Sequence, residues 1–288
     1  MNGSGVLYVV ATPIGNLADV TERALRVLAE VAVIAAEDTR HTRRLLAHYG
    51  ISAKLLSCHD HNEAEATPRV LELLAKGKDV ALVSDAGTPL ISDPGFSLVQ
   101  AARARGLRVV PVPGANAALC ALCAAGLPCD RFLFLGFPPR GEAKRREWIR
   151  SVAVEPGTLI LYESGNRVVT TLQDLSAVLG GGRRAVVARE LTKRFETFLD
   201  GTLEELASRA GGNPDQRKGE LVILIEGNRG PAGDAQTKEE ERVLGALVAE
   251  LPMKQAAALA ARITGGKKNR LYKLALQWQE EGTAGPGP

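Results

Sequence analysis

The sequence has few cysteines and no long hydrophobic run. Only four cysteines occur among 288 residues, and three of them (Cys120, Cys123 and Cys129) lie in an Ala/Leu-rich stretch. Free cysteine in such a stretch behaves as a small buried hydrophobe, so we expect no disulfides. No apolar run reaches the roughly 20 residues of a membrane-spanning helix, and the first residues lack the basic segment of a signal peptide. These absences predict a cytoplasmic protein with no membrane partner.

The chain also has little net charge. Its 36 Lys and Arg residues against 33 Asp and Glu leave +3, which excludes a protein that holds nucleic acid by bulk charge. Residues 251–278, however, contain no acidic residue and six basic ones: Lys254, Arg262, Lys267, Lys268, Arg270 and Lys273. A solvated helix face normally mixes the two signs. We therefore expect a basic helical segment, residues 238–280, that contacts RNA, and no DNA partner.

Short apolar runs alternate with amphipathic stretches along most of the chain. The runs at 6–11, 31–36, 79–83, 108–112 and 132–135 predict strands with helices between them, and a second alternating set follows a Pro-rich break at 137–142. Such alternation predicts an α/β fold, and the length suggests two α/β domains. We place them at 1–137, which carries most of the ligand loops, and at 138–230, which closes a cleft with the first.

Four loops that follow predicted strands are rich in glycine, proline and polar residues: ATPIGNLAD (11–19), SDAGTPLISDPG (84–95), VPGAN (112–116) and ESGNR (163–167). Ligands of α/β sheets bind at the carboxyl ends of strands. Glycine lets the backbone approach a ligand, and Asp85, just past a strand, can hold ribose hydroxyls or an ammonium group. The phosphate-binding patterns GxxxxGK[ST] and GxGxxG are absent. Together the loops predict a small, uncharged or zwitterionic ligand between the two α/β halves.

Two polar clusters have more than one interpretation. Residues 58–63 (CHDHNE) contain metal-ligand types, but neighbours on an extended chain point in opposite directions and no second cluster completes a coordination shell. We expect a polar loop there and no metal. Residues 37–44 (EDTRHTRR) fit either a capped helix start or a set of phosphate and ribose contacts.

These motifs together resemble the tetrapyrrole-methylase (class III) family of S-adenosylmethionine-dependent methyltransferases. The similar stretches run in order from residue 7 to about 276, and ATPIGNLAD, AAEDTRHT and SDAGTPLISDPG are the most specific of them. Within the family the likeness is to members that methylate the ribose 2′-hydroxyl of cytidine 1402 in 16S rRNA of the small ribosomal subunit. The resemblance implies an α/β protein of two domains, usually a homodimer, with S-adenosylmethionine in the cleft between them.

The resemblance also implies a set of cofactor-binding residues. They are Pro13, Asp85, Gly87, Thr88, Pro89, Ile91, Ala115 and Asn116 in the first domain, and Tyr162, Ala188, Gly219 and Leu221 in the second. The chain departs from the family at Asn166, where the usual pattern Glu-Ser-x-His-Arg has histidine. Asparagine cannot accept a proton near neutral pH, so a catalytic histidine is excluded at this position.

Methyl transfer to a hydroxyl needs a group that takes the hydroxyl proton. Candidates on the cleft loops are Asp38, Glu163 and Glu190, and the sequence does not rank them. Arg40, Arg167, Arg189 and Lys193 are candidates for holding flanking phosphates or for lowering the pKa of the ribose hydroxyl. The step itself needs no metal.

Three other functions compete with this interpretation. The first is a methyltransferase of the same fold that acts on a small molecule such as a tetrapyrrole. The second is a metal-dependent phosphohydrolase built on His59, Asp60, His61 and Asp85. The third is a non-catalytic RNA-binding module, which would bind RNA in a salt-sensitive way and would not bind the cofactor.

Overall fold

The computed structural model describes residues 3–217, 219–228 and 234–280. The chain forms two compact units, Met1–Gly227 and Asn228–Pro288. The first unit contains two five-stranded sheets, and the second contains three helices. The predicted α/β class with a small C-terminal helical segment is confirmed. The predicted domain boundary at 137/138 stays a prediction, and the end of the second predicted domain at 230 lies outside the described residues.

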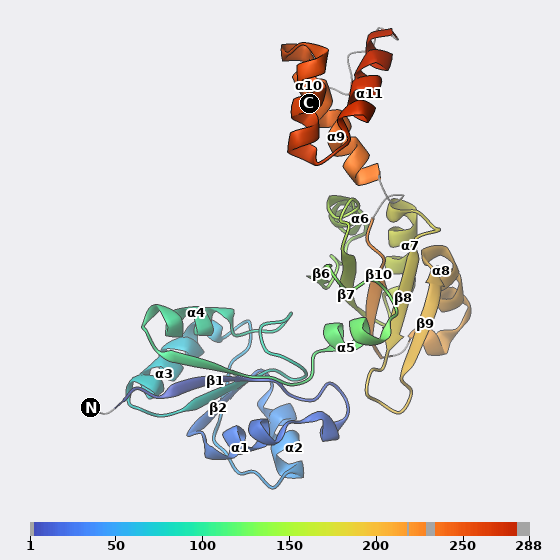
Figure 1. Ribbon diagram of the computed structural model, residues 1–288. Coiled ribbons are helices and arrows are strands. Elements are labelled where there is room, and N and C mark those ends of the chain that lie inside the picture. Colours follow the sequence, from blue (N-terminus) through green and yellow to red (C-terminus); the bar gives the residue numbers. More distant parts are fainter. Residues whose placement is uncertain (1–2, 218, 229–233, 281–288) are drawn as a thin grey trace. The chain divides into compact units, whose positions relative to one another are not determined.

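The first sheet is parallel throughout, with the strand order β3-β2-β4-β1-β5. Its strands are β1 (Val6–Val10), β2 (Val33–Ala36), β3 (Leu55–Ser57), β4 (Val80–Val83) and β5 (Arg108–Val112). Helices α1 (Glu22–Glu30) and α2 (Thr39–His48) cover one face, while α3 (Glu63–Ala75) and α4 (Phe96–Ala104) cover the other (Figure 1). Because both faces are covered, the central strand β4 is apolar and buried along its whole length.

The second sheet is mixed, with the order β6-β7-β10-β8-β9, and only β6 and β7 run parallel. Its strands are β6 (Phe132–Gly136), β7 (Thr158–Ser164), β8 (Arg184–Arg189), β9 (Thr197–Thr202) and β10 (Glu220–Ile225). Helices α6 (Glu142–Ser151), α7 (Val168–Leu179) and α8 (Leu203–Gly212) pack on one face. The other face is covered by α5 (Ala117–Ala124), together with Ile14 and Leu191 from two of the loops. Helix α5 precedes this sheet in the chain, yet its apolar side chains pack against it.

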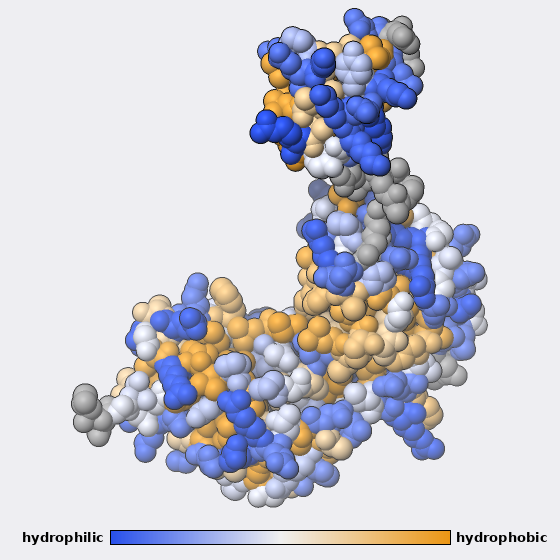
Figure 2. Space-filling model, in the orientation of Figure 1, coloured by the Kyte–Doolittle hydropathy of each residue, from blue (hydrophilic) through white to orange (hydrophobic). Residues whose placement is uncertain are grey.

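The C-terminal unit consists of α9 (Asp234–Glu250), α10 (Met253–Thr264) and α11 (Lys268–Glu280). Its core is made of small and medium side chains, among them Leu244, Ala256, Ala260 and Leu271. Gly265 ends α10 in the left-handed conformation (φ 73°), which lets the chain reverse into α11. Hydrophilic side chains cover much of this unit (Figure 2), and all six basic residues of 251–278 are exposed. Across the described ranges, no helix has the length and apolarity needed to cross a membrane.

Candidate functional site

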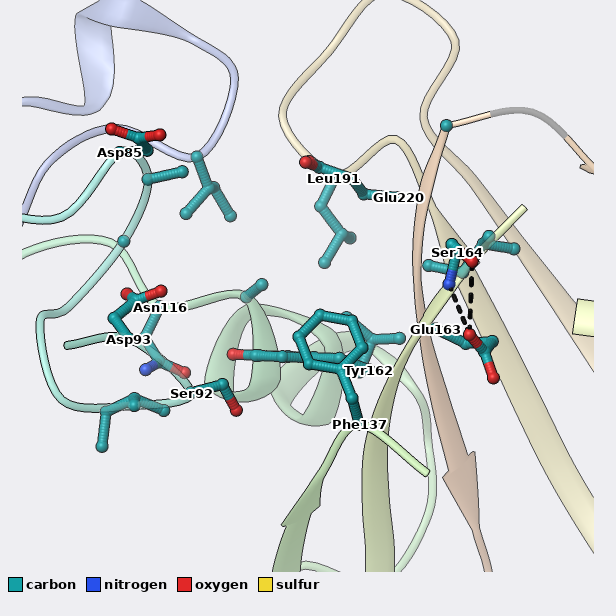
Figure 3. Close-up of a pocket in the computed structure, with 18 of the residues that line it drawn as sticks. Asp85, Ser92, Asp93, Asn116, Phe137, Tyr162, Glu163, Ser164, Leu191 and Glu220 are labelled. Atoms are coloured by element: carbon teal, nitrogen blue, oxygen red, sulfur yellow. Dashed lines mark hydrogen bonds between the residues drawn. The ribbon is translucent and has the colours of Figure 1, made fainter. Parts of the chain in front are cut away.

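A pocket of about 390 Å³ lies where loops from both sheets meet in the first unit (Figure 3). The loop after β4 supplies one wall, with Glu37 and Ile14 from the loops after β2 and β1 beside it. Strands β1, β2 and β4 are parallel, so their carboxyl ends reach the same edge of the sheet. The second sheet supplies the opposite wall through Tyr162 and through the segments 190–193 and 219–222. The volume of the pocket falls in the range of small-molecule sites, roughly 300–1,000 Å³.

The loop after β4 is held in an unusual backbone conformation. Thr12 and Gly87 exchange two backbone hydrogen bonds, at 2.8 and 3.1 Å, and Gly87 has a φ of 84°. Leu90 and Ser92 have φ values of 74° and 67°, although neither is glycine. Non-glycine residues adopt this region at a cost and are concentrated at functional sites. This conformation belongs to the loop segment that brings Ser92 and Asp93 to the pocket.

The first wall of the pocket is acidic. The Asp85 carboxylate accepts a hydrogen bond from the Asp38 N–H at 3.0 Å, and the Asp85 N–H donates to Glu37 at 3.2 Å. Burial, together with the charges of Asp85 and Asp60, raises the pKa of Glu37. Burial and the neighbouring carboxylates also raise the pKa of Asp93 to about 7, although the Ser84 hydroxyl opposes the shift. A wall of this charge favours a ligand that carries a positive group.

The opposite wall contains aromatic side chains. The Tyr162 ring lies edge-to-face with Phe134 and Phe137, with centroid distances of 5.0 and 5.5 Å. The Tyr162 hydroxyl accepts a hydrogen bond from the Ala118 N–H at 3.2 Å, at the start of α5. Burial raises the pKa of Tyr162, so the phenol stays neutral. The wall therefore offers an apolar ring surface beside the charged loop.

The loop between β8 and β9 ties the second sheet to the first. The Asn16 N–H donates to the Thr192 hydroxyl at 3.1 Å, and a side chain at Gly15 would collide with Lys193, whose Cγ would lie 2.6 Å from its Cβ. Lys193 in turn bridges Glu190 and Glu220, at 3.1 and 3.2 Å. Glycine at position 15 is thus required by the approach of this loop.

Comparison with known proteins identifies the family. Residues 6–207 match the Tetrapyrrole (Corrin/Porphyrin) Methylases, and residues 234–279 match the RsmI C-terminal HTH domain. The chain is 56% identical over 277 residues to the ribosomal RNA small subunit methyltransferase I of Pseudomonas aeruginosa, an alignment that covers 96% of this chain and 98% of the relative. The enzyme of the same name from Escherichia coli O157:H7 is 52% identical over 278 residues, with 96% and 97% covered.

The chain belongs to the ribosomal RNA small subunit methyltransferase I family, within the tetrapyrrole methylases. Solved structures show the fold. The methyltransferase CobJ aligns with a TM-score of 0.59 at 22% identity, over 78% of this chain and 95% of that one. Uroporphyrin-III C-methyltransferase from Thermus thermophilus, complexed with S-adenosylhomocysteine, aligns with a TM-score of 0.53 at 21% identity, over 76% and 97%.

The structure brings together most of the cofactor residues that the family resemblance implies. Eight of them line the pocket: Asp85, Gly87, Thr88, Ile91, Asn116, Tyr162, Gly219 and Leu221. The other four (Pro13, Pro89, Ala115 and Ala188) are absent from its lining, and all but Ala115 are buried. The carbonyl of Ala115 accepts a hydrogen bond from the Thr88 hydroxyl at 3.1 Å, so Ala115 holds a side chain that lines the pocket. Their roles in binding stay predictions.

The candidate proton acceptors differ in their surroundings. Asp38 does not line the pocket: it caps α2, and its hydrogen bond with Arg40 lowers its pKa to about 2. This geometry fits the helix-start interpretation of residues 37–44. Glu163 lines the pocket but is buried, and its two oxygens accept hydrogen bonds from Thr171 (2.6 Å) and from the Ser164 N–H (2.8 Å).

Glu190 also lines the pocket, with its carboxylate engaged. Burial acts to raise its pKa, but hydrogen bonds from Lys193 and from the Glu220 N–H outweigh burial and lower it. Burial acts in turn to lower the pKa of Lys193, and its two carboxylate partners outweigh that effect, so the lysine stays charged. Arg40 and Arg189 are not part of the lining, and Arg189 donates to Thr197 and to the Phe195 carbonyl at 3.2 Å.

Several pocket residues were not predicted individually, among them Asp93 and Phe137, and Glu37 was predicted only as part of the cluster 37–44. Asp93 belongs to the SDAGTPLISDPG motif, where a second aspartate in a Gly/Pro loop was an available signal. Phe137 directly follows a strand and precedes two prolines, which places a large apolar side chain at a strand end. No group of three His, Cys, Asp or Glu suited to a metal ion occurs in the described part of the chain.

Proposed function

We propose that the chain transfers the methyl group of S-adenosylmethionine to the ribose 2′-hydroxyl of cytidine 1402 of 16S rRNA in the small ribosomal subunit. The observation that carries this proposal is the pocket between the two sheets, with acidic side chains on one wall and aromatic rings on the other. The family relationship supports the choice of acceptor, because the relatives named above are ribosomal RNA small subunit methyltransferases.

The residues of the pocket fit this cofactor. S-adenosylmethionine carries a sulfonium, an ammonium group and a carboxylate, so its net charge suits the acidic wall of Glu37, Asp85 and Asp93. Its flat adenine suits the ring of Tyr162 and the apolar side chain of Leu221. Asp85 is the residue that we expect to hold the positive or hydroxyl-bearing part of the molecule. Bound there, the cofactor supplies a methyl group already activated for displacement.

The chain must align the acceptor oxygen and remove its proton. Alignment alone can lower a barrier by several kcal/mol. We propose that the 2′-hydroxyl proton passes to a carboxylate oxygen of Asp93 as the oxygen–carbon bond forms and the sulfur–carbon bond breaks. Asp93 faces the pocket, and its pKa of about 7 matches a base that works near neutral pH. Asp38, Glu163 and Glu190 are each paired with an arginine or a lysine of the chain, and a positive neighbour makes a carboxylate a weaker base.

Methyl transfer to two acceptors tests the proposal against its nearest alternative. The chain is mixed with radiolabelled S-adenosylmethionine and either small subunits that lack the modification or a tetrapyrrole such as uroporphyrinogen III. We expect label to enter the 16S rRNA, up to about one methyl group per subunit, and not the tetrapyrrole. Label in the tetrapyrrole alone would favour the small-molecule methyltransferase, and no transfer to either acceptor would contradict the proposal.

We further propose that the C-terminal unit docks on the rRNA through its exposed basic residues. Arg270 also pairs with the buried Glu240, so the variant replaces Lys254, Lys267, Lys268 and Lys273 with glutamine and leaves Arg270 in place. We expect small-subunit affinity to fall about 10- to 100-fold and the salt dependence of binding to become shallower, because each lost phosphate contact removes about 0.7–0.9 from the slope. S-adenosylmethionine affinity is expected to be unchanged.

Exposed arginines at the opposite edge of the first sheet provide the control. Arg103, Arg105 and Arg108 lie near the amino end of β5, away from the carboxyl ends that form the pocket. Their replacement by glutamine is expected to leave rRNA affinity within about twofold of the wild type, since they lie outside the docking face. Equal losses in both variants would mean that only net charge matters. The homodimer and the cytoplasmic location also stay predictions.

A further inference from the structure

One aromatic side chain stays largely exposed although it lines the pocket. Aromatic residues make up only 4% of the chain, and Phe137 keeps 56% of its surface accessible. Its ring stands edge-to-face with the ring of Tyr162, with 5.5 Å between the two centroids, and both residues are labelled in Figure 3. Tyr162 is half-buried, and its hydroxyl is held by the start of α5. The pocket thus has an inner ring that is packed on other groups and an outer ring that is open.

The backbone before Phe137 is shaped to place it there. The pairing of β6 with β7 shifts register between Phe134 and Gly136, and Gly136 adopts a left-handed φ of 67°. A Cβ atom at Gly136 would lie 3.1 Å from the Ser92 hydroxyl, so the end of β6 lies against the loop after β4. Register shifts of this kind re-aim a side chain at the edge of a sheet.

Two arginines, Arg145 of α6 and Arg167 at the start of α7, hold the residues that follow Phe137. Arg167 donates to the carbonyl oxygens of Pro138 and Pro139 at 2.7 and 3.1 Å. Arg145 donates to the Arg140 carbonyl at 3.0 Å. Proline also fixes its own φ, so the segment directly after Phe137 has little freedom.

Both arginines are in turn fixed by buried carboxylates. Arg145 pairs with Asp174 at 2.5 Å, and both side chains are almost fully buried. Arg167 lies 3.4 Å from the buried carboxylate of Glu163. Burying charged groups is expensive, so such pairs are poor evidence for stability by themselves. Here they fix a surface turn that carries an exposed phenylalanine.

We infer that Phe137 is the platform on which the base of the acceptor nucleotide stacks. This inference rests on the proposed function, because it assumes that the pocket receives a nucleotide of RNA. Proteins recognise unstacked RNA bases by stacking them on rigid aromatic side chains. The backbone directly after Phe137 is held by hydrogen bonds, and its ring is exposed at the same pocket as Asp93, so a base on the ring keeps the attached ribose near the proposed proton acceptor. Tyr162, which the family resemblance assigns to the cofactor, then packs against the adenine of S-adenosylmethionine.

The test distinguishes stacking of a base on Phe137 from simple apolar packing. It also distinguishes a contact with the acceptor base from a contact with the adenine of S-adenosylmethionine. Phe137→Ala and Phe137→Leu are expected to lower kcat/KM for small subunits, and their direct affinity for subunits, by about 10- to 100-fold, as for the loss of one stacked base. The affinity for S-adenosylmethionine, measured by calorimetry, is expected to stay within about twofold. Phe137→Tyr is expected to restore the wild-type values. Phe132→Ala, which truncates an exposed phenylalanine at the start of β6 and outside the pocket lining, is the matched control.

Several results would overturn the inference. Weaker cofactor binding with unchanged subunit binding would assign Phe137 to adenine. Full activity and affinity in Phe137→Leu would mean that only apolar packing is needed. An equal loss of subunit affinity in Phe132→Ala would mean that the loss is not specific to Phe137. A wild-type chain that binds subunits but transfers no methyl group would contradict the proposed function, and the subunit affinities of the Phe137 variants would still test the platform.

Discussion

Replacing Asp93 with asparagine is expected to lower kcat for methyl transfer by about 100- to 1,000-fold, within the range that a general base contributes. The two side chains have nearly the same shape, so the loop after β4 is expected to change little, and the loss of one of the three acidic side chains of this wall is expected to weaken cofactor binding much less than it lowers kcat. Single-turnover transfer to small subunits, with calorimetry for the cofactor, measures both quantities. Glu190→Gln is the matched control, and we expect a much smaller loss because Glu190 is already paired with Lys193. An unchanged kcat in Asp93→Asn would remove this residue from the mechanism.

The same residue predicts the pH dependence of the wild type. Only the carboxylate form of Asp93 can accept a proton, and its pKa is about 7. The rate is therefore expected to rise about tenfold per pH unit below pH 7 and to level off above it. The charge of Glu37 helps to raise the pKa of Asp93, so Glu37→Gln is expected to shift this limb to lower pH. An unshifted limb in Glu37→Gln, or an intact limb in Asp93→Asn, would contradict the assignment.

Replacing Asp85 with alanine is expected to weaken S-adenosylmethionine binding by about 10- to 100-fold, as for the loss of a hydrogen bond to a charged group in a partly buried site. Asp85 is the second residue of the loop after β4 and lines the pocket, and its carboxylate also accepts a hydrogen bond from the Asp38 N–H. Calorimetric titration gives the affinity, and circular dichroism shows whether the fold is kept. Asp60→Ala removes a charge close enough to affect Glu37 but outside the pocket lining. A comparable loss in Asp60→Ala would mean that long-range charge alone binds the cofactor.

The position of the pocket could be predicted from the sequence because its determinants are local. The apolar runs of β1, β4 and β5 end in Gly/Pro-rich loops, and parallel strands bring those ends to one edge. The loop SDAGTPLISDPG accordingly lines the pocket, and so do Tyr162 and Gly219, which only the family resemblance had implied. A capped helix start was one of two interpretations of residues 37–44, and it agrees with the structure, in which Asp38 caps α2.

The partners of the carboxylates could not be predicted, because they depend on the geometry of turns and on which strands pair. Glu163 accepts a hydrogen bond from Thr171 across the turn between β7 and α7, and Glu190 accepts one from the Glu220 N–H on another strand. Burial contributes most to the raised pKa of Asp93, and the charges of Glu37 and Asp60, which follow different strands, add to it. Phe137 owes its position to a register shift and to Arg145 and Arg167, and neither has a local sequence signal.

The measurement that tests the central claim most directly is the chemical position of the transferred methyl group. Small subunits are methylated by the wild-type chain with labelled S-adenosylmethionine, and the 16S rRNA is then digested with alkali and with nuclease. A 2′-O-methyl group blocks alkaline cleavage at its own nucleotide, so the label is expected in an alkali-resistant dinucleotide that contains cytidine 1402. Label on a base, or in alkali-sensitive mononucleotides, would contradict a ribose methyltransferase.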